Sequence, residues 1–169
     1  RFAFQIQPNN PGFSYPEHLQ QVYRALYHRN VPVDIVSPSS DLAAYKLVFA
    51  PALHIVTPDI ASRLAQYVEN GGVLVCTART GVKDEFNTVV NMPLPGLLAG
   101  LCGVTVEDYD SLPDGAGQPL QFTIASVTGQ PTARAWCDIL APTTAAVAAT
   151  YTQEYYAGRP AITVNSAGA

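Results

Sequence analysis

Residues 71–87 read GGVLVCTARTGVKDEFN and contain a helix stop, a buried strand and a polar loop in direct succession. The glycine pair ends a helical pattern, and the apolar run 73–76 is typical of a strand buried on both faces. The loop carries the charged and amide side chains Arg79, Lys83, Asp84, Glu85 and Asn87. In open α/β sheets, ligands and partners bind at the carboxyl ends of strands. The loop has no nucleophile with a base, no phosphate-binding glycine pattern and no metal-ligand set, so we expect contact there rather than catalysis.

The segments before this stretch alternate between helix and strand patterns. Ser14 and Thr57 are typical helix N-caps, each with a proline in the first turn and apolar residues at helical spacing after it. Residues 2–6, 33–36 and 47–50 are short apolar runs typical of strands. Continuous apolar strands that alternate with amphipathic helices indicate a parallel sheet covered on both faces. We therefore predict an α/β fold in three layers with a mostly parallel sheet.

The second half of the chain is less regular. Its patterns predict a short helix at residues 95–101, a strand at 104–107 and one helical turn at 136–140. Residues 145–151 and 160–165 flank a turn and predict a hairpin at the edge of the sheet.

The composition limits the kinds of partner that this protein can be expected to bind. Only 13% of the 169 residues are charged, about half of the usual ~25%, which suggests that other protein covers part of the surface. The length fits one domain, residues 1–169, and strand patterns at both ends suggest a fragment of a longer chain. The net charge of −4 without a basic stripe argues against nucleic acid. No apolar run reaches the ~20 residues of a membrane span.

The three cysteines, Cys76, Cys102 and Cys137, are widely spaced and odd in number. That usage favours reduced thiols in an intracellular protein over a disulfide framework. Cys76 falls where some α/β enzymes place a catalytic thiol. It lies inside the strand pattern without flanking glycines, however, so we expect a structural core cysteine.

The carboxylates and histidines do not form a recognisable catalytic or metal site. Asp84 and Glu85 are adjacent, which seldom aims both side chains at one substrate, and the simplest role for them is ion pairing with Arg79 and Lys83. A second acidic group at a strand end would repel itself without a cation; it comprises Glu107, Asp108 and Asp110. The histidines lack ligand spacing. We expect no catalytic residues, no metal and no cofactor.

An aromatic group near the C-terminal end has three interpretations. Tyr151, Tyr155, Tyr156 and Trp136 are suited to stacking on sugars, but tyrosines are also common in cores and in protein interfaces. We favour core or interface and retain Tyr155 and Tyr156 as interface candidates.

Eight stretches together resemble one family. They are residues 7–12 (QPNNPG), 23–26 (YRAL), 31–36 (VPVDIV), 45–51 (YKLVFAP), 79–85 (RTGVKDE), 94–96 (LPG), 106–109 (VEDY) and 155–158 (YYAG). The chain resembles the middle domain, known as the trimerisation domain, of glycoside hydrolase family 42 β-galactosidases. Residues 79–85 are the most specific part of this resemblance.

The resemblance implies a fold like that of class I glutamine amidotransferases, a flavodoxin-like fold, without the catalytic cysteine, since neither Thr77 nor Ala78, where the nucleophile elbow would fall, is a thiol. It implies a non-catalytic oligomerisation domain of a cytoplasmic bacterial β-galactosidase, a retaining glycosidase that cleaves terminal β-D-galactosides. The implied partners are the catalytic TIM barrel of the same parent chain and the other copies of a homotrimer.

Two other functions stay open. One is an amidotransferase-like small-molecule enzyme or sensor, and the other is a carbohydrate-binding module that uses the tyrosines. In the preferred interpretation, Arg79 pairs with a carboxylate of the partner, so its replacement would weaken docking while the fold survives.

Overall fold

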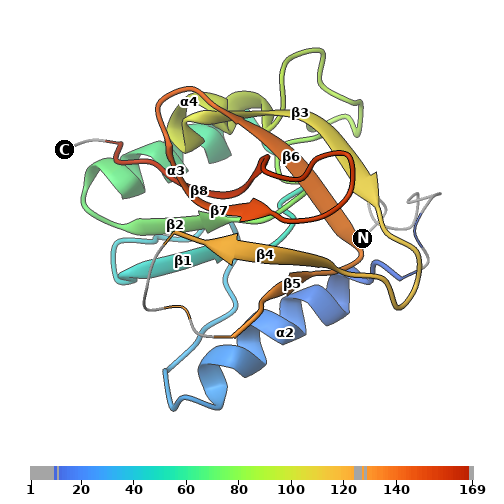
Figure 1. Ribbon diagram of the computed structural model, residues 1–169. Coiled ribbons are helices and arrows are strands. Elements are labelled where there is room, and N and C mark those ends of the chain that lie inside the picture. The colour runs from blue at the N-terminus through green and yellow to red at the C-terminus, as the bar shows by residue number, and fades with distance from the viewer. Residues whose placement is uncertain (1–9, 11, 124–126, 128, 168–169) are drawn as a thin grey trace.

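The computed structural model describes residue 10, residues 12–123, residue 127 and residues 129–167 (Figure 1). Its first half contains α2 (Tyr15–Tyr27), β1 (Leu47–Ala50), α3 (Pro58–Glu69) and β2 (Val73–Cys76). The second half contains the 3₁₀ helix η1 (Gly96–Leu98), α4 (Ala99–Cys102) and strands β3 (Val104–Ser111), β4 (Gln118–Phe122), β5 (Thr132–Ala133), β6 (Trp136–Pro142), β7 (Ala146–Tyr151) and β8 (Pro160–Val164). The strand predicted at residues 2–6 lies outside the described residues.

Both long helices begin at the predicted caps. The Ser14 hydroxyl accepts a hydrogen bond from the amide of Glu17 at 3.4 Å, and that of Thr57 from the amide of Ile60 at 3.2 Å. Each cap satisfies an amide that the first helical turn leaves without a partner. The two helix predictions are confirmed.

The parallel half consists of β1 and β2, which pair from Leu47 opposite Val73 to Ala50 opposite Cys76. Helix α3 covers one face of this pair and buries Leu64 and Tyr67 there. The predicted strand at residues 33–36 is not formed, since these residues have no regular structure.

The antiparallel half contains the remaining strands. β3 pairs with β6, and the order β5-β4-β7-β8 makes a second sheet in which neighbours are antiparallel. The predicted hairpin is confirmed as β7 and β8. The helical turn predicted at residues 136–140 is wrong, because these residues form β6, in which Cys137 and Ile139 are buried and their neighbours less so.

The prediction of a three-layer, mostly parallel α/β fold of the class I glutamine amidotransferase or flavodoxin-like type is wrong. Among the described strands, the parallel ladder is confined to β1 and β2, and the other pairings are antiparallel. The periodicity up to residue 76 does indicate helix-covered parallel strands. The second half does not follow that pattern. Its strands alternate in burial and curl together.

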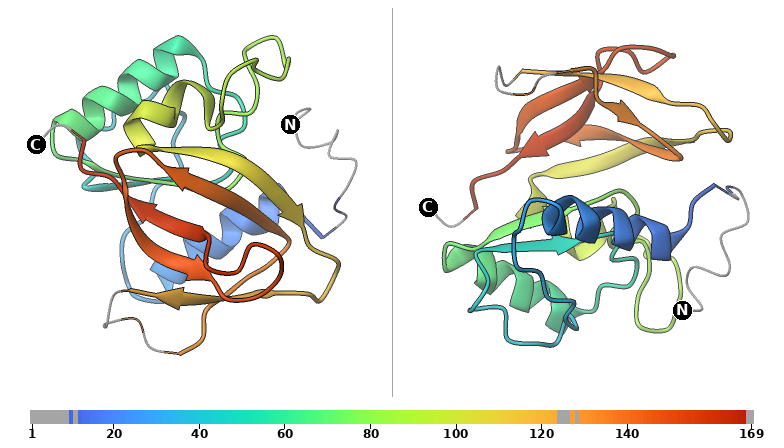
Figure 2. Two further views of the ribbon diagram at one scale, coloured as in Figure 1. Left: turned by 45° about the horizontal axis from the view of Figure 1, so that its top comes forward. Right: turned by 90° about the horizontal axis from the view of Figure 1, so that it is seen from below.

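Each half has its own core. Figure 2 (right) shows the antiparallel strands as a layer over β1, β2 and α2, with β3 between them. The parallel half buries Leu42, Val56, Leu64, Tyr67 and Leu98. The antiparallel half buries Leu112, Cys137, Ile139, Tyr151 and Tyr156. The loop that follows β2 lies where the two halves meet.

Candidate functional site

The polar loop begins with a turn that is fixed from several sides. The Thr77 hydroxyl accepts a hydrogen bond from the amide of Ala52 at 2.8 Å and lies 3.0 Å from His18 Nε2 on α2. The hydroxyl of Thr80 donates to the Thr77 carbonyl at 2.8 Å. These contacts place the start of the loop at the carboxyl end of β2, as the sequence predicted, and also at that of β1.

Arg79 joins this turn to the antiparallel half through its backbone. Its amide donates to Asp138 Oδ2 at 3.2 Å, and its carbonyl accepts from His54 Nδ1 at 3.2 Å. Arg79 adopts a φ of 68°, in the left-handed region that L-residues seldom occupy. A strained backbone of this kind persists only where the surroundings over-determine it. Arg79 is therefore a structural joint.

The side chain of Arg79 stacks between two aromatic rings. Its guanidinium carbon lies 4.1 Å from the ring centre of Trp136 and 5.6 Å from that of Phe13. Its Nε is buried and has no hydrogen-bond partner among the described residues. Burial lowers the pKa of this guanidinium, although Arg stays charged at neutral pH. The guanidinium is thus half-buried beside these rings, and the pairing of Arg79 with a carboxylate of a partner stays a prediction.

Trp136 stacks with two other side chains. The guanidinium of Arg79 lies over its ring, and the ring of Tyr109 stacks on it with centres 4.6 Å apart and planes 13° apart. Trp136 Nε1 donates to Asp138 Oδ1 at 2.8 Å. Burial raises the pKa of Asp138, and its hydrogen bonds to Trp136 and Arg79 oppose that shift. The two oxygens of Asp138 thus fix both the tryptophan and the turn.

The next polar residues close a compact hairpin. Lys83 Nζ donates to Asn87 Oδ1 at 2.9 Å, and Asp84 Oδ1 accepts from the amides of Phe86 and Thr88 at 3.0 and 2.8 Å. The amide of Asp84 also donates to the Thr88 carbonyl at 3.0 Å. Ion pairs of the loop carboxylates with Arg79 and Lys83 were expected, but the ion pairs among the described residues are Arg63–Asp59 and Arg159–Glu107. The hairpin is held by hydrogen bonds within the loop.

The base of the hairpin rests on two other segments. The amide of Lys83 donates to the carbonyl of His54 at 2.9 Å, and the amide of Val56 donates to the carbonyl of Lys83 at 3.1 Å. Gly81 lies against Pro95 so closely that a Cβ at Gly81 would overlap the Pro95 carbonyl. The stretches RTGVKDE and LPG, which eight residues separate in the sequence, therefore meet here.

Glu85 and Phe86 form the exposed tip of the hairpin. Phe86 is 81% exposed, the largest exposed fraction among the large hydrophobic residues described. The sequence pattern predicts contacts by the polar residues of the loop and does not indicate Phe86. An aromatic residue inside a polar loop is the signal that could have drawn attention to it.

Tyr155 and Tyr156 lie on another part of the molecule, in the turn between β7 and β8. Tyr155 is 74% exposed and donates to Asp108 Oδ2 at 3.1 Å. Tyr156 is only 1% exposed, packs edge-on against Tyr151 and donates to Asp110 Oδ2 at 2.7 Å. Tyr156 is thus a core residue, and Tyr155 alone of this pair offers a surface.

Cys76 lies at the end of β2 and is half-buried. Its hydrogen bond with Cys102, together with burial, strongly raises the pKa of the Cys76 thiol. A catalytic thiol needs a lowered pKa, so this environment does not activate Cys76. Among the described residues no group of three or more His, Cys, Asp or Glu side chains could hold a metal ion. No helix among these residues is long and apolar enough to cross a membrane.

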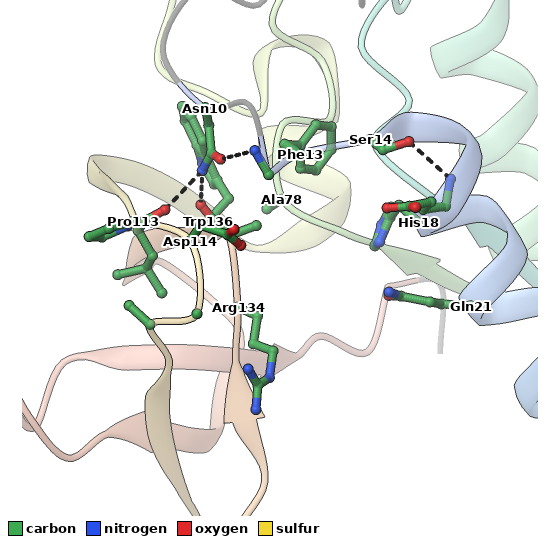
Figure 3. Close-up of a pocket in the computed structure, with 16 residues that line it drawn as sticks. Asn10, Phe13, Ser14, His18, Gln21, Ala78, Pro113, Asp114, Arg134 and Trp136 are labelled. Atoms are coloured by element: carbon green, nitrogen blue, oxygen red, sulfur yellow. Dashed lines mark hydrogen bonds between the residues drawn. The ribbon is translucent and has the colours of Figure 1, made fainter.

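A cavity of about 310 Å³ opens beside the Arg79 joint (Figure 3). Phe13 and His18 line it from the α2 side, and Arg134 and Trp136 from the antiparallel half. Asn10 donates to the carbonyls of Leu112 and Ala135 at its rim. A larger cleft of about 860 Å³, lined mainly by apolar residues, runs between β2 and the antiparallel strands. Both the cavity and the cleft lie between the two halves of the molecule. Neither is lined by a set of residues that could act together in catalysis.

Comparisons with known proteins identify the family. The family model described as β-galactosidase trimerisation domain matches residues 1–169. The chain is 37% identical to β-galactosidase BgaA of Clostridium cellulovorans and 39% identical to β-galactosidase Bga of Halorubrum lacusprofundi, with 97% and 99% of this chain aligned. It covers 24% and 25% of those two proteins, about a quarter of their length.

Solved structures agree with this assignment. The crystal structure of β-galactosidase from Bacillus circulans sp. alkalophilus matches 94% of this chain and 24% of its own, at a TM-score of 0.90 and 31% identity. The β-galactosidase of Halorubrum lacusprofundi matches 98% of this chain and 24% of its own, at a TM-score of 0.90 and 37% identity. The architecture of a parallel pair joined to an antiparallel half is thus similar to that found within these enzymes. The chain belongs to the β-galactosidase trimerisation domain family.

Proposed function

We propose that this chain is the non-catalytic assembly domain of a β-galactosidase and that it holds three copies of the parent protein together. The parent would cleave terminal β-D-galactosides in the cytoplasm with a catalytic TIM barrel on the same polypeptide. The observation that carries this proposal is the family match over the whole chain together with relatives that are β-galactosidases about four times its length.

The contact surface in this proposal is the loop of residues 79–87, with Tyr155 as a second, separate contact. Its support is the position of the loop at the carboxyl ends of β1 and β2 and its projection from the body of the domain. Within it, Lys83, Asp84 and Asn87 hold the backbone through hydrogen bonds, and Glu85 is exposed to a partner. Arg79 supports the loop from below.

Two observations oppose the other candidate functions. A sugar-binding module stacks its ligand on exposed rings, yet Tyr151 and Tyr156 are buried and Trp136 is half-buried against Arg79 and Tyr109, which leaves Tyr155 as the exposed ring of this group. An amidotransferase-like enzyme needs a thiol displayed on a turn beside a base, yet Cys76 lies within β2 and its hydrogen-bond partner is the thiol of Cys102.

Sedimentation velocity of the full-length protein tests the proposal. We expect a trimer at micromolar concentrations that dissociates on dilution. A monomer across the whole concentration range would contradict the assembly function. As a test of the surface, Glu85→Arg in the same protein should weaken the trimer, because it reverses the exposed charge of the loop without touching its internal hydrogen bonds.

A further inference from the structure

Two thiols that twenty-five residues separate in the sequence meet beside the larger cleft. Cys76 is the last residue of β2, and Cys102 is the last residue of α4. Both side chains pack against the core of the parallel half, both line the cleft, and both are free cysteines. A hydrogen bond joins the two thiols. It brings their sulfur atoms together, which is the first geometric requirement of a disulfide.

The two thiols differ in how readily they ionise. The Cys76 thiol donates the hydrogen bond, which together with burial strongly raises its pKa. Acceptance of that bond lowers the pKa of the Cys102 thiol, although burial opposes the shift. The thiolate is the form that attacks a disulfide. Cys102 is therefore the better nucleophile of the pair, and Cys76 lies beside it as a second thiol.

The cleft gives a small molecule access to this pair. It has a volume of about 860 Å³, and both cysteines in its lining are partly exposed. Cys137 provides a contrast within the same chain. It is 1% exposed and packs beside Tyr151 and Tyr156 in the core of the antiparallel half, where burial raises the pKa of its thiol. Cys76 and Cys102 are thus more accessible to a reagent than Cys137 is.

We propose that Cys76 and Cys102 form a site of reversible oxidation, at which a small-molecule disulfide in the cleft converts the two thiols into an intrachain disulfide. The Cys102 thiolate attacks one sulfur of the small disulfide and releases the other half as a thiolate, which takes up the proton that Cys102 gave up. The Cys76 sulfur then attacks Cys102 in this mixed disulfide, and its proton passes to the second departing thiolate. Two protein thiols and one small disulfide thus become one protein disulfide and two small thiols.

The disulfide would enclose the polar loop in a covalent ring. Its ends, Cys76 and Cys102, lie on either side of residues 79–87, and Gly103 leads directly from α4 into β3. Closing a ring restricts the unfolded chain more than the folded one, so oxidation stabilises this part of the fold. Small thiols reverse the reaction through the same mixed disulfide.

The experiment exposes the native full-length protein to an excess of oxidised mercaptoethanol, a small neutral disulfide. Mass spectrometry of a digest made without reduction then maps the products. We expect a peptide pair linked through Cys76 and Cys102, which separates on treatment with dithiothreitol, while Cys137 stays a free thiol. If Cys76 and Cys102 stay reduced in the native protein although they react after unfolding in urea, the proposal is wrong. Modification of Cys137 at the same rate would also overturn it, because the reaction would then not be specific to the pair.

Two matched serine variants test the order of the steps. In Cys76→Ser the hydroxyl can still donate to Cys102, but the second attack is blocked, so we expect a stable mixed disulfide on Cys102. In Cys102→Ser burial still disfavours the Cys76 thiolate, which should react about 10-fold more slowly or less. Faster reaction of Cys76 than of Cys102 would overturn the assignment of Cys102 as the attacking thiol.

Hydrogen exchange of the oxidised and reduced native protein tests the effect of the ring. The amides of Gly81 and Lys83 donate to the carbonyls of Leu53 and His54, so they exchange only when the base of the loop opens. We expect their exchange to slow by about 10-fold in the oxidised form, because the ring restricts the opened state. Unchanged exchange at both amides would overturn this part of the inference.

Discussion

The two halves of the molecule bury side chains of different chemistry. The core of the parallel half is mostly aliphatic, with Leu42, Val56, Leu64 and Leu98, and its buried Tyr67 donates to the Val73 carbonyl at 3.3 Å. In the antiparallel half, Tyr151 and Tyr156 are buried, and their hydroxyls donate to the Asp138 carbonyl at 2.8 Å and to Asp110 Oδ2 at 2.7 Å. The hydrophobic effect does not depend on direction, whereas a buried hydroxyl needs a hydrogen-bond partner in a defined position. The antiparallel half is therefore the more sharply specified of the two.

The largest expected effects come from emptying the two cores. Tyr156→Ala should lower the free energy of unfolding by about 3–5 kcal/mol, since it leaves a cavity and a carboxylate of Asp110 without its donor. Leu64→Ala in the parallel half should cost about 2–5 kcal/mol through the cavity alone. Urea unfolding of the chain measures both. If Leu64→Ala lowered the free energy of unfolding clearly more than Tyr156→Ala does, the buried tyrosines would not specify the fold more strongly than the aliphatic core.

Arg79 connects the halves, and its replacement is the next largest effect. Arg79→Ala removes the stacking on Trp136 and should cost about 1–3 kcal/mol. The sequence-based expectation was that the fold would tolerate this change, but the half-buried position of Arg79 argues otherwise. Arg79→Gly should be less harmful than Arg79→Ala by about 1 kcal/mol, because glycine accepts a positive φ without strain.

The relative stability of Arg79→Ala and Arg79→Gly shows whether position 79 requires a positive φ and a buried side chain. At an ordinary position glycine is more destabilising than alanine, and at an exposed arginine both changes are within about 0.5 kcal/mol of wild type. Thermal unfolding of the two variants side by side distinguishes these cases. Alanine and glycine variants as stable as wild type would mean that Arg79 is not a joint between the halves.

A smaller effect isolates the hydroxyl of Tyr156. Tyr156→Phe keeps the ring and its edge-on contact with Tyr151 and loses the hydrogen bond to Asp110, so we expect a loss of about 0.5–1.5 kcal/mol. Tyr155→Phe is the matched control, because its hydroxyl also donates to an aspartate but lies at the surface. Its effect should be close to zero in the same urea titration. Equal losses of unfolding free energy at both positions would show that burial does not determine how much this hydrogen bond contributes to stability.

The local signals of the parallel half were strong enough for prediction. Proline after a capping Ser14 or Thr57, and apolar residues at helical spacing, report contacts within one element. The polar loop after β2 was located by the same means. At residues 136–140 no such signal exists, because Cys137 and Ile139 become buried through pairing of β6 with β3, a partner more than twenty residues away in the chain.

The environment of Arg79 could not be predicted for a similar reason. Phe13 and Trp136, which cover its guanidinium, are separated from it by more than fifty residues in each direction. A charged residue in a loop is normally exposed, so composition alone assigns Arg79 to the surface. The family resemblance named the domain correctly because motif residues such as those at 79–85 can be recognised without knowledge of their contacts. It did not describe the antiparallel half.

The smallest expected effect concerns the acidic group on β3. Glu107 forms an ion pair with Arg159 at the surface, where the two side chains are 51% and 45% exposed. Exposed pairs of this kind contribute only about 0–1 kcal/mol, so Glu107→Gln should scarcely change stability. If this chain is an assembly domain, galactoside hydrolysis by the full-length protein should also keep its kcat within about twofold, whereas loss of a catalytic carboxylate lowers rates by orders of magnitude. Turnover of a chromogenic galactoside measures this. A thousandfold loss would place Glu107 in an active site, and the division between a catalytic barrel and a non-catalytic assembly domain would then be wrong.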